Sequence, residues 1–252
     1  MFSASVARAQ GDKPELITDR PDQTESSSVV PRGLWQFELG WVFGEGTSGA
    51  EDLKVNQVPS SLLRVGLLDR LELRFGWNGM QVQSLGNTRS RGAGDAQIGA
   101  KVALWNQNGV LPKTALLLGT SIPSGSRQFS TQRTDPGIRL LMSSDLTETF
   151  SLGWNLGTVW ETTEEAADKD TFPRGVYTVA LGISALEKTG FFVEFFGDTA
   201  LNGRSRAVNN LDGGLTHLIR PNVQLDFAVG KGLSSESLDW FLTAGVSFRL
   251  PY

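Results

Sequence analysis

Residues 34–43 read LWQFELGWVF, and apolar and polar side chains alternate along this stretch. The apolar positions are Trp35, Phe37, Leu39, Trp41 and Phe43, and the positions between them include Gln36, Glu38 and Gly40. Because successive side chains of a β-strand point to opposite faces, the stretch predicts a strand with one wide apolar face and one polar face.

The same period of two returns along the rest of the chain. It is clearest at residues 71–78, 95–104, 151–160 and 239–250, and weaker at 54–67, 113–120, 135–145, 174–186, 191–199, 209–219 and 223–229. With the first stretch, these segments predict twelve strands. The alternation slips near Pro59, which has no N–H to donate to a neighbouring strand, so a bulge or a strand end is expected there.

The connections between the predicted strands fall into two classes that alternate along the chain. Short turns are expected at residues 68–70, 106–112, 145–148, 187–190 and 220–222, and longer loops at 44–53, 84–93, 121–134, 161–173, 200–208 and 230–238. Short periplasmic turns and longer extracellular loops are typical of outer-membrane barrels. The sequence therefore predicts an all-β chain, a closed antiparallel transmembrane β-barrel of about twelve strands with both termini in the periplasm.

The composition argues against several other classes of protein. The 252 residues carry a net charge of -4, with 23 Lys and Arg against 27 Asp and Glu, which is not the basic excess of a nucleic-acid-binding protein. No apolar run approaches the roughly 18 to 20 residues of a spanning helix. Mean hydropathy is -0.15, as a barrel with one polar face allows. Cysteine is absent, so neither disulfides nor thiolate sites are expected, and no metal or cofactor site is predicted.

A soluble β-sandwich is the main alternative fold, since its strands also alternate. Three features favour the membrane barrel: the wide apolar faces, polar faces rich in glycine, serine and charges of both signs, and the regular alternation of short and long connections. Aromatic residues also gather at strand ends, where the two girdles of a membrane barrel lie. These are Trp41, Phe43, Trp77, Trp105, Phe150, Trp160, Tyr177, Phe191 and Trp240.

The residues before the first strand divide into two parts. Residues 1–9 end in Ala7-Arg8-Ala9, which resembles the small-residue cleavage site of a signal peptide, so they are interpreted as a residual signal peptide. Residues 10–33 are expected to be a periplasmic segment, and residues 34–252 the barrel. Export of this kind places the protein in the bacterial outer membrane, in contact with lipid and lipopolysaccharide after insertion by the barrel assembly machinery.

The segment before the barrel carries charges that suit a plug. These are Asp19, Arg20, Asp22 and Glu25. A twelve-strand bore lies between barrels filled by side chains and open porins, so a short peptide could block it. Arg20 would then pair with Glu38, Glu72 or Glu194, and the two aspartates with Arg64, Arg74, Arg139 or Arg249. Asp95, Lys101 and Asp226 complete the expected lumen charges. A leader running along the periplasmic side, and a purely structural network of lumen charges, remain alternatives.

Several blocks of sequence resemble a known outer-membrane family. They are LITDRPDQTES at residues 16–26, VPRG at 30–33, WQFELG at 35–40, PSSLLRVGL at 59–67, LELR at 71–74, VEFFG at 193–197, Leu225-Asp226 and GVSFRL at 245–250. The family is assigned to phenol degradation through the MetA pathway and consists of channel or transporter proteins. The resemblance implies passive uptake of small solutes, among them aromatic or hydrophobic compounds.

Two other functions compete with a channel. One is a structural or interaction barrel with a closed lumen. The other is an outer-membrane enzyme that modifies lipids with a Ser and His pair on the outer wall. The single histidine, His217, has Leu215 and Ile219 two residues away on the same face, and no Ser. We therefore expect His217 to be an interfacial residue of the apolar wall, and no catalytic residue is predicted.

Overall fold

The computed structural model describes residues 14–165, 168–203 and 206–251. Its strands are β1 (Trp35–Ser48), β2 (Glu51–Leu68), β3 (Leu71–Trp77), β4 (Met80–Leu85), β5 (Thr88–Ala93), β6 (Ala96–Trp105), β7 (Lys113–Ile122), β8 (Pro136–Asp145), β9 (Phe150–Glu165), β10 (Asp168–Leu186), β11 (Thr189–Ala200), β12 (Val208–Arg220), β13 (Val223–Gly232) and β14 (Trp240–Leu250). One 3-10 turn, Arg127–Phe129, lies between β7 and β8. No helix among the described residues is long and apolar enough to cross a membrane.

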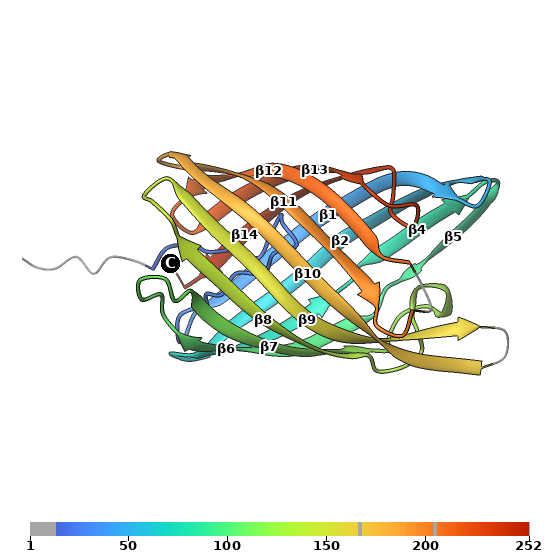
Figure 1. Ribbon diagram of the computed structural model, residues 1–252, viewed down its shortest axis with the longest axis horizontal. Helices are drawn as coiled ribbons and strands as arrows, with labels where there is room; N and C mark the ends of the chain where they lie inside the picture. Colours follow the sequence, from blue (N-terminus) through green and yellow to red (C-terminus); the bar gives the residue numbers. More distant parts are fainter. Residues whose placement is uncertain (1–13, 166–167, 204–205, 252) are drawn as a thin grey trace, which may run out of the picture.

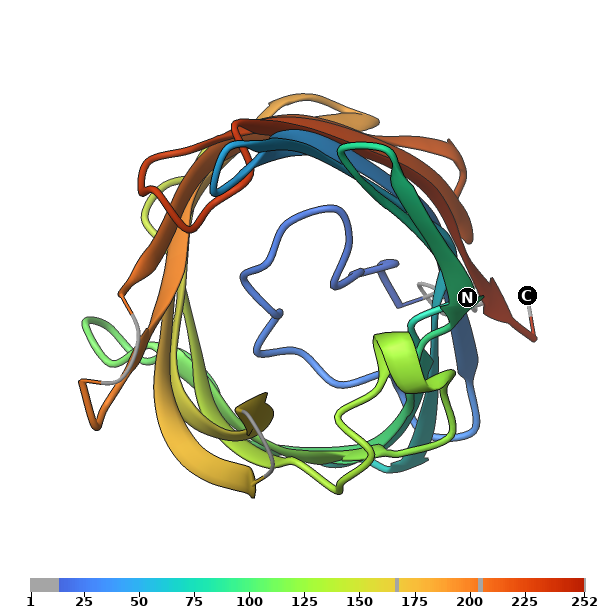
Figure 2. The same cartoon turned by 90° about the vertical axis from the view of Figure 1, so that its right-hand side faces the viewer.

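The strands form one closed antiparallel barrel (Figure 1, Figure 2). Closure is made by β1 and β14, which pair from Trp35 opposite Leu250 to Glu45 opposite Trp240. β2 pairs with β3 at one end and with β4 at the other, and β4 pairs with β5 as β3 pairs with β6. β3 and β4 therefore share one position in the wall, and β5 and β6 share another. The fourteen strands of the described residues thus occupy twelve positions. The predicted fold is confirmed.

The break between β3 and β4 lies opposite Pro59. On the other side of β2, Gly40 of β1 faces Ser60 while Val42 faces Gln57, so the wall carries a bulge at Val58 and Pro59, as the slipped alternation predicts. Gly79, between β3 and β4, has φ +64, and a Cβ there would lie 2.0 Å from the carbonyl oxygen of Pro59. Only glycine meets both conditions at this position.

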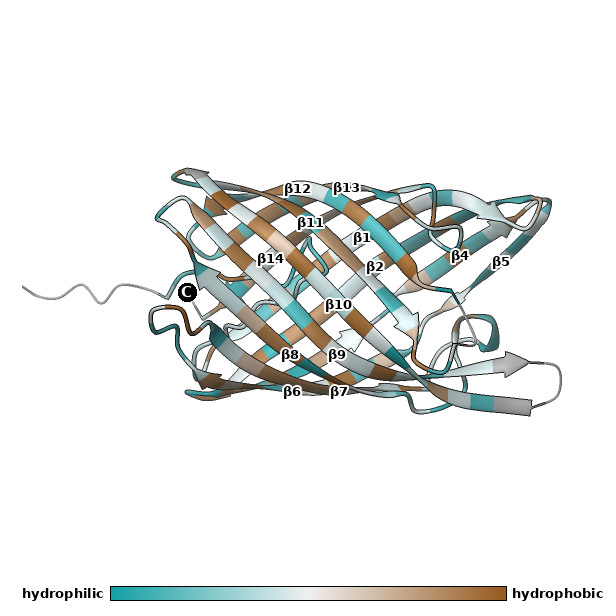
Figure 3. Cartoon of the chain, in the orientation of Figure 1, coloured by the Kyte–Doolittle hydropathy of each residue, from teal (hydrophilic) through white to brown (hydrophobic). Residues whose placement is uncertain are grey.

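Three of the predicted long loops are wrong. Residues 44–53 form the ends of β1 and β2, residues 84–93 form most of the hairpin of β4 and β5, and β9 and β10 extend to Glu165 and Asp168. These hairpins project beyond the apolar band (Figure 3). Both faces of such an extension contact water, so the alternation that marks a strand in the membrane disappears from the sequence.

The barrel has a polar interior and an apolar outer wall, the reverse of a soluble protein. Fully buried side chains include Gln36, Glu38, Arg64, Glu72, Lys101 and Glu194. Large apolar side chains are exposed all round the outside, among them Phe75, Leu118, Leu156, Val193 and Phe227. An apolar surface of this extent requires a lipid environment, which decides against the soluble sandwich.

Candidate functional site

Residues 14–33, here called the luminal segment, lie within the ring of strands (Figure 2). The segment forms no β-strand, so its backbone N–H groups need other partners. Wall carboxylates supply several of them: Glu38 accepts from the N–H of Asp19 at 3.0 Å, and Glu72 accepts from the N–H of Val30 at 2.7 Å. An irregular peptide is thereby held inside the barrel by charge-assisted hydrogen bonds.

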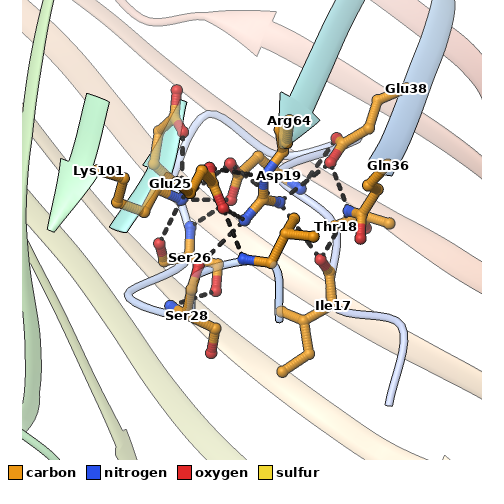
Figure 4. A network of polar contacts seen from close by, with 12 residues as sticks. Ile17, Thr18, Asp19, Glu25, Ser26, Ser28, Gln36, Glu38, Arg64 and Lys101 are labelled. Carbon is orange, nitrogen blue, oxygen red and sulfur yellow. Dashed lines mark hydrogen bonds and ion pairs between the residues drawn. The ribbon is translucent and has the colours of Figure 1, made fainter. Parts of the chain in front are cut away.

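Asp19 is the centre of the charged contacts. Its carboxylate lies 3.1 Å from Arg64, 2.5 Å from Arg74 and 2.9 Å from Lys101. Figure 4 shows Asp19 between Arg64 of β2 and Lys101 of β6, two strands that both pair with β3. All four side chains are buried, so loss of the single carboxylate would leave three cations with fewer partners in a dry environment. Lys101 was not among the partners expected for Asp19.

Arg20 contacts a different part of the wall from the one predicted. It donates to Asp226 on β13 at 3.1 Å and to Thr243 on β14 at 2.7 Å, not to Glu38, Glu72 or Glu194. The guanidinium occupies the space left by two paired glycines, Gly40 and Gly245, where a Cβ would lie 2.1 Å and 2.5 Å from Arg20 atoms. The glycines therefore determine which way Arg20 turns.

The middle of the segment is fixed to β9, β10 and β11. Glu25 receives a hydrogen bond from Arg74 at 2.6 Å, and its backbone exchanges two hydrogen bonds with Asn155. Glu194 accepts from the N–H of Gln23 at 2.7 Å and from the hydroxyl of Thr24 at 2.5 Å. Asn155 was missed from the sequence, although its place on the polar face of the strand at 151–160 was a signal for it.

The remaining predicted residues lie away from the contacts of Asp19. Arg249 donates to the carbonyls of Pro14 and Glu15 and to Gln36, so it holds the start of the segment and not an aspartate. Asp95 accepts from the N–H of Gly125 at 2.8 Å and holds the connection between β7 and β8. In the described part of the chain, the contacts of Asp19 and Asp22 do not include Arg139.

Two cavities lie on either side of the luminal segment. The one at the extracellular end, here called the vestibule, has a volume of about 1080 Å³, and Glu25 and Arg74 are among its lining residues. The one at the periplasmic end has about 360 Å³ and is lined in part by Ile17, Pro31 and Arg249. No residue lines both cavities, and the segment contributes Glu25 to the first and Ile17 and Pro31 to the second.

The amino-acid sequence matches the model of the family described as "Putative MetA-pathway of phenol degradation" over residues 18–250. The chain belongs to this family. The match includes most of the luminal segment and nearly all of the barrel, so both parts are features of the family's common sequence. A search among curated proteins gives no match.

Solved structures with a similar fold are outer-membrane proteins. An outer-membrane channel from Pseudomonas putida F1 aligns at a TM-score of 0.69 with 14% identity, covering 89% of this chain and 98% of that one. The NanC porin aligns at 0.57 with 12% identity, covering 86% and 100%. The translocator domain of the autotransporter NalP from Neisseria meningitidis aligns at 0.54 with 12% identity, covering 88% and 90%. This family member thus has the fold of outer-membrane β-barrels.

Proposed function

We propose that this protein is a channel of the bacterial outer membrane for the passive uptake of small solutes, and that its bore is closed by the luminal segment. The observation that carries the proposal is the pair of cavities with the segment between them. Each cavity is large enough for a small molecule, and passage from one to the other requires the segment to move. The ion pairs of Asp19 and Arg20 oppose that movement.

The vestibule suits solutes that have both an apolar body and a polar group. Its wall combines the apolar side chains of Leu117, Val159 and Val176 with the polar groups of Gln97 and Arg139. The family description concerns phenol degradation, and the P. putida relative is described as a channel. These observations support small aromatic compounds, such as phenols, as the solutes that this family member takes up.

We assign no enzymatic role to the barrel. The recorded partner of His217 is the hydroxyl of Thr189 at 2.9 Å, on the exposed outer wall. A lipid-modifying site needs a nucleophile, a base and an oxyanion site arranged together, and a lone Thr and His contact at the membrane boundary does not support one. We propose instead that this outer wall contacts lipid and lipopolysaccharide, and that the barrel assembly machinery inserts the chain.

The test of channel function is to weaken the hold on the luminal segment. Replacing Asp19, Arg20 and Asp22 together with Ala removes the ion pairs to three wall cations and one wall carboxylate. The sequence of every barrel strand stays unchanged. We expect increased single-channel conductance in planar bilayers and faster swelling of liposomes in phenol and other small solutes. The matched control replaces the exposed pair Glu45 and Lys54 with Ala, which lies outside the lumen contacts.

The control should conduct as the unmodified protein does. If the triple variant folds but neither conducts nor admits solutes better than the unmodified protein, a structural barrel with a closed lumen becomes the better account. Folding of each variant is checked by its electrophoretic mobility before and after heating.

A further inference from the structure

Two carboxyl groups face each other on the inner wall where the luminal segment touches β11. Glu194 of β11 and Asp212 of β12 are directly opposite in the strand register. Both are buried, with exposed fractions of 0% and 4%. Residues opposite each other in antiparallel strands have Cβ atoms about 5 Å apart. Both side chains therefore lie side by side on the lumen face of the wall.

Among the described residues, neither oxygen of Asp212 has a hydrogen-bond donor, and its cross-strand neighbour, Glu194, is another acceptor. Asp22 of the luminal segment adds a third carboxyl, since the next residue, Gln23, donates its N–H to Glu194. Arg20, a cation of the segment, is bonded to Asp226 of β13. Two buried carboxylates without a cation cannot both be ionised at small cost, so this place requires one positive charge.

A proton fits the place better than a metal ion does. Both oxygens of Glu194 already accept hydrogen bonds from the luminal segment, through Gln23 and Thr24. A calcium ion needs about six to eight oxygen ligands, whereas a shared proton needs one donor and one acceptor. With the proton on Asp212, its hydroxyl donates to Glu194, and the carboxyl group of Asp212 then has a hydrogen-bond partner.

We propose that Glu194 and Asp212 form a proton-binding site that holds the luminal segment, and that loss of this proton releases the segment around Asp22 to Thr24. Removing the proton leaves the wall pair doubly charged beside Asp22, and the repulsion acts directly on the segment. The groups facing the pair are Asp22 from the segment and, further along the wall, Asp226 with its partner Arg20. The inference rests on the proposed closing role of the segment, but its test measures the mobility of the segment directly.

The test follows the mobility of the segment with a spin label. The chain has no cysteine, so Gln23→Cys gives a single labelling site, and Gln23 contacts Glu194 through its backbone N–H, which the substitution keeps. In lipid vesicles we expect an immobile label at acidic pH and a growing mobile component as the pH rises. Asp212→Asn keeps a donor next to Glu194 without a titratable proton, so the label should stay immobile throughout.

The matched control is Asp198→Asn, which changes a lumen carboxylate of the same strand, β11, that is paired with Arg174. It should titrate as the unmodified protein does. Infrared spectra of the protein without the label should show one protonated carboxyl band that Asp212→Asn removes and Asp198→Asn keeps. Mobility that is independent of pH overturns the proposal. So does mobility set by the concentration of calcium or sodium with no carboxyl band lost, since that assigns the site to a metal cation.

Failure of the inference is distinct from failure of the channel function. A label that titrates in a barrel that never conducts supports the proton site and contradicts uptake. Conductance that rises in the Asp19, Arg20 and Asp22 variant, with a label unaffected by pH, supports the channel and overturns the proton site.

Discussion

Gly79 and Gly49 share the same backbone torsion, φ +64, and differ in their surroundings. A Cβ at Gly49 would meet no atom within 4 Å, whereas one at Gly79 would meet the carbonyl of Pro59. Single residues in this barrel are therefore constrained in two separable ways, by torsion alone or by torsion and contact. The same distinction applies to the paired glycines that receive Arg20, where contact alone excludes a larger side chain.

The first prediction separates these two constraints. Gly49→Ala should lower the free energy of unfolding by about 1 kcal/mol, the cost of a left-handed torsion in a non-glycine residue. Gly79→Ala should cost about 3 kcal/mol or more, because the backbone of β2 must also shift to admit the methyl group. Urea unfolding in lipid vesicles, followed by tryptophan fluorescence, measures both. Equal losses would mean that the break between β3 and β4 relaxes freely.

At the scale of the strand, the two faces of each element meet different solvents. On β9, Leu156 has 55% of its surface exposed on the outer wall, and its neighbour Asn155 is 1% exposed and bonded to Glu25. A strand with this pattern tolerates charge only where water or a polar partner is present. Asn155 is hydrogen-bonded to the luminal segment, so not every position on the lumen face tolerates a charged substitution.

The second prediction compares the two faces with one substitution. Leu156→Arg should cost about 2 to 4 kcal/mol of unfolding free energy, since it places a charge against lipid. The control is Gln97→Arg on β6, whose side chain is exposed to the vestibule, and it should cost less than about 1 kcal/mol. Unfolding in vesicles measures the difference. Equal costs at the two positions would reverse the assignment of inside and outside.

For the whole molecule, the decisive contact is the pairing of β1 with β14, which joins the two ends of the chain. Eleven residue pairs, from Trp35 and Leu250 to Glu45 and Trp240, complete the ring of the barrel wall. The ring also encloses the luminal segment, which is bonded to strands on several sides of the barrel. Closure and retention of the segment are thus properties of the assembled ring.

The third prediction is that folded protein shifts in electrophoretic mobility on heating and shows a circular dichroism spectrum dominated by β-structure. A closed barrel without an exposed edge has no strand from which local unfolding starts, so it resists detergent at room temperature. Removing Trp240–Leu250 opens the ring and should abolish the folded band. A truncated chain that still gives the folded band, or a strongly helical spectrum of the full chain, contradicts the closed ring.

The fold was largely predictable because alternation is local. Each strand within the membrane must present an apolar face to lipid and a polar one to the lumen. Apolar and polar residues therefore alternate along stretches such as residues 35–43, and this alternation can be found in the sequence. The extracellular hairpins were not predicted, because strands with water on both faces need no alternation of apolar and polar residues. The identity of the lumen charges followed from the same rule, as at Glu38, Arg64, Glu72 and Lys101.

Tertiary structure alone decided which of those charges meet. Arg20 and Asp226 are 206 residues apart in the chain, and Glu194 meets Asp212 because β11 and β12 pair in one particular register. The sequence determined that the interior is charged and that a polar segment precedes the barrel. Partner choice inside the lumen depends on ring closure, on register and on the space that Gly40 and Gly245 leave, and each of these is a relation between distant residues that no local pattern encodes.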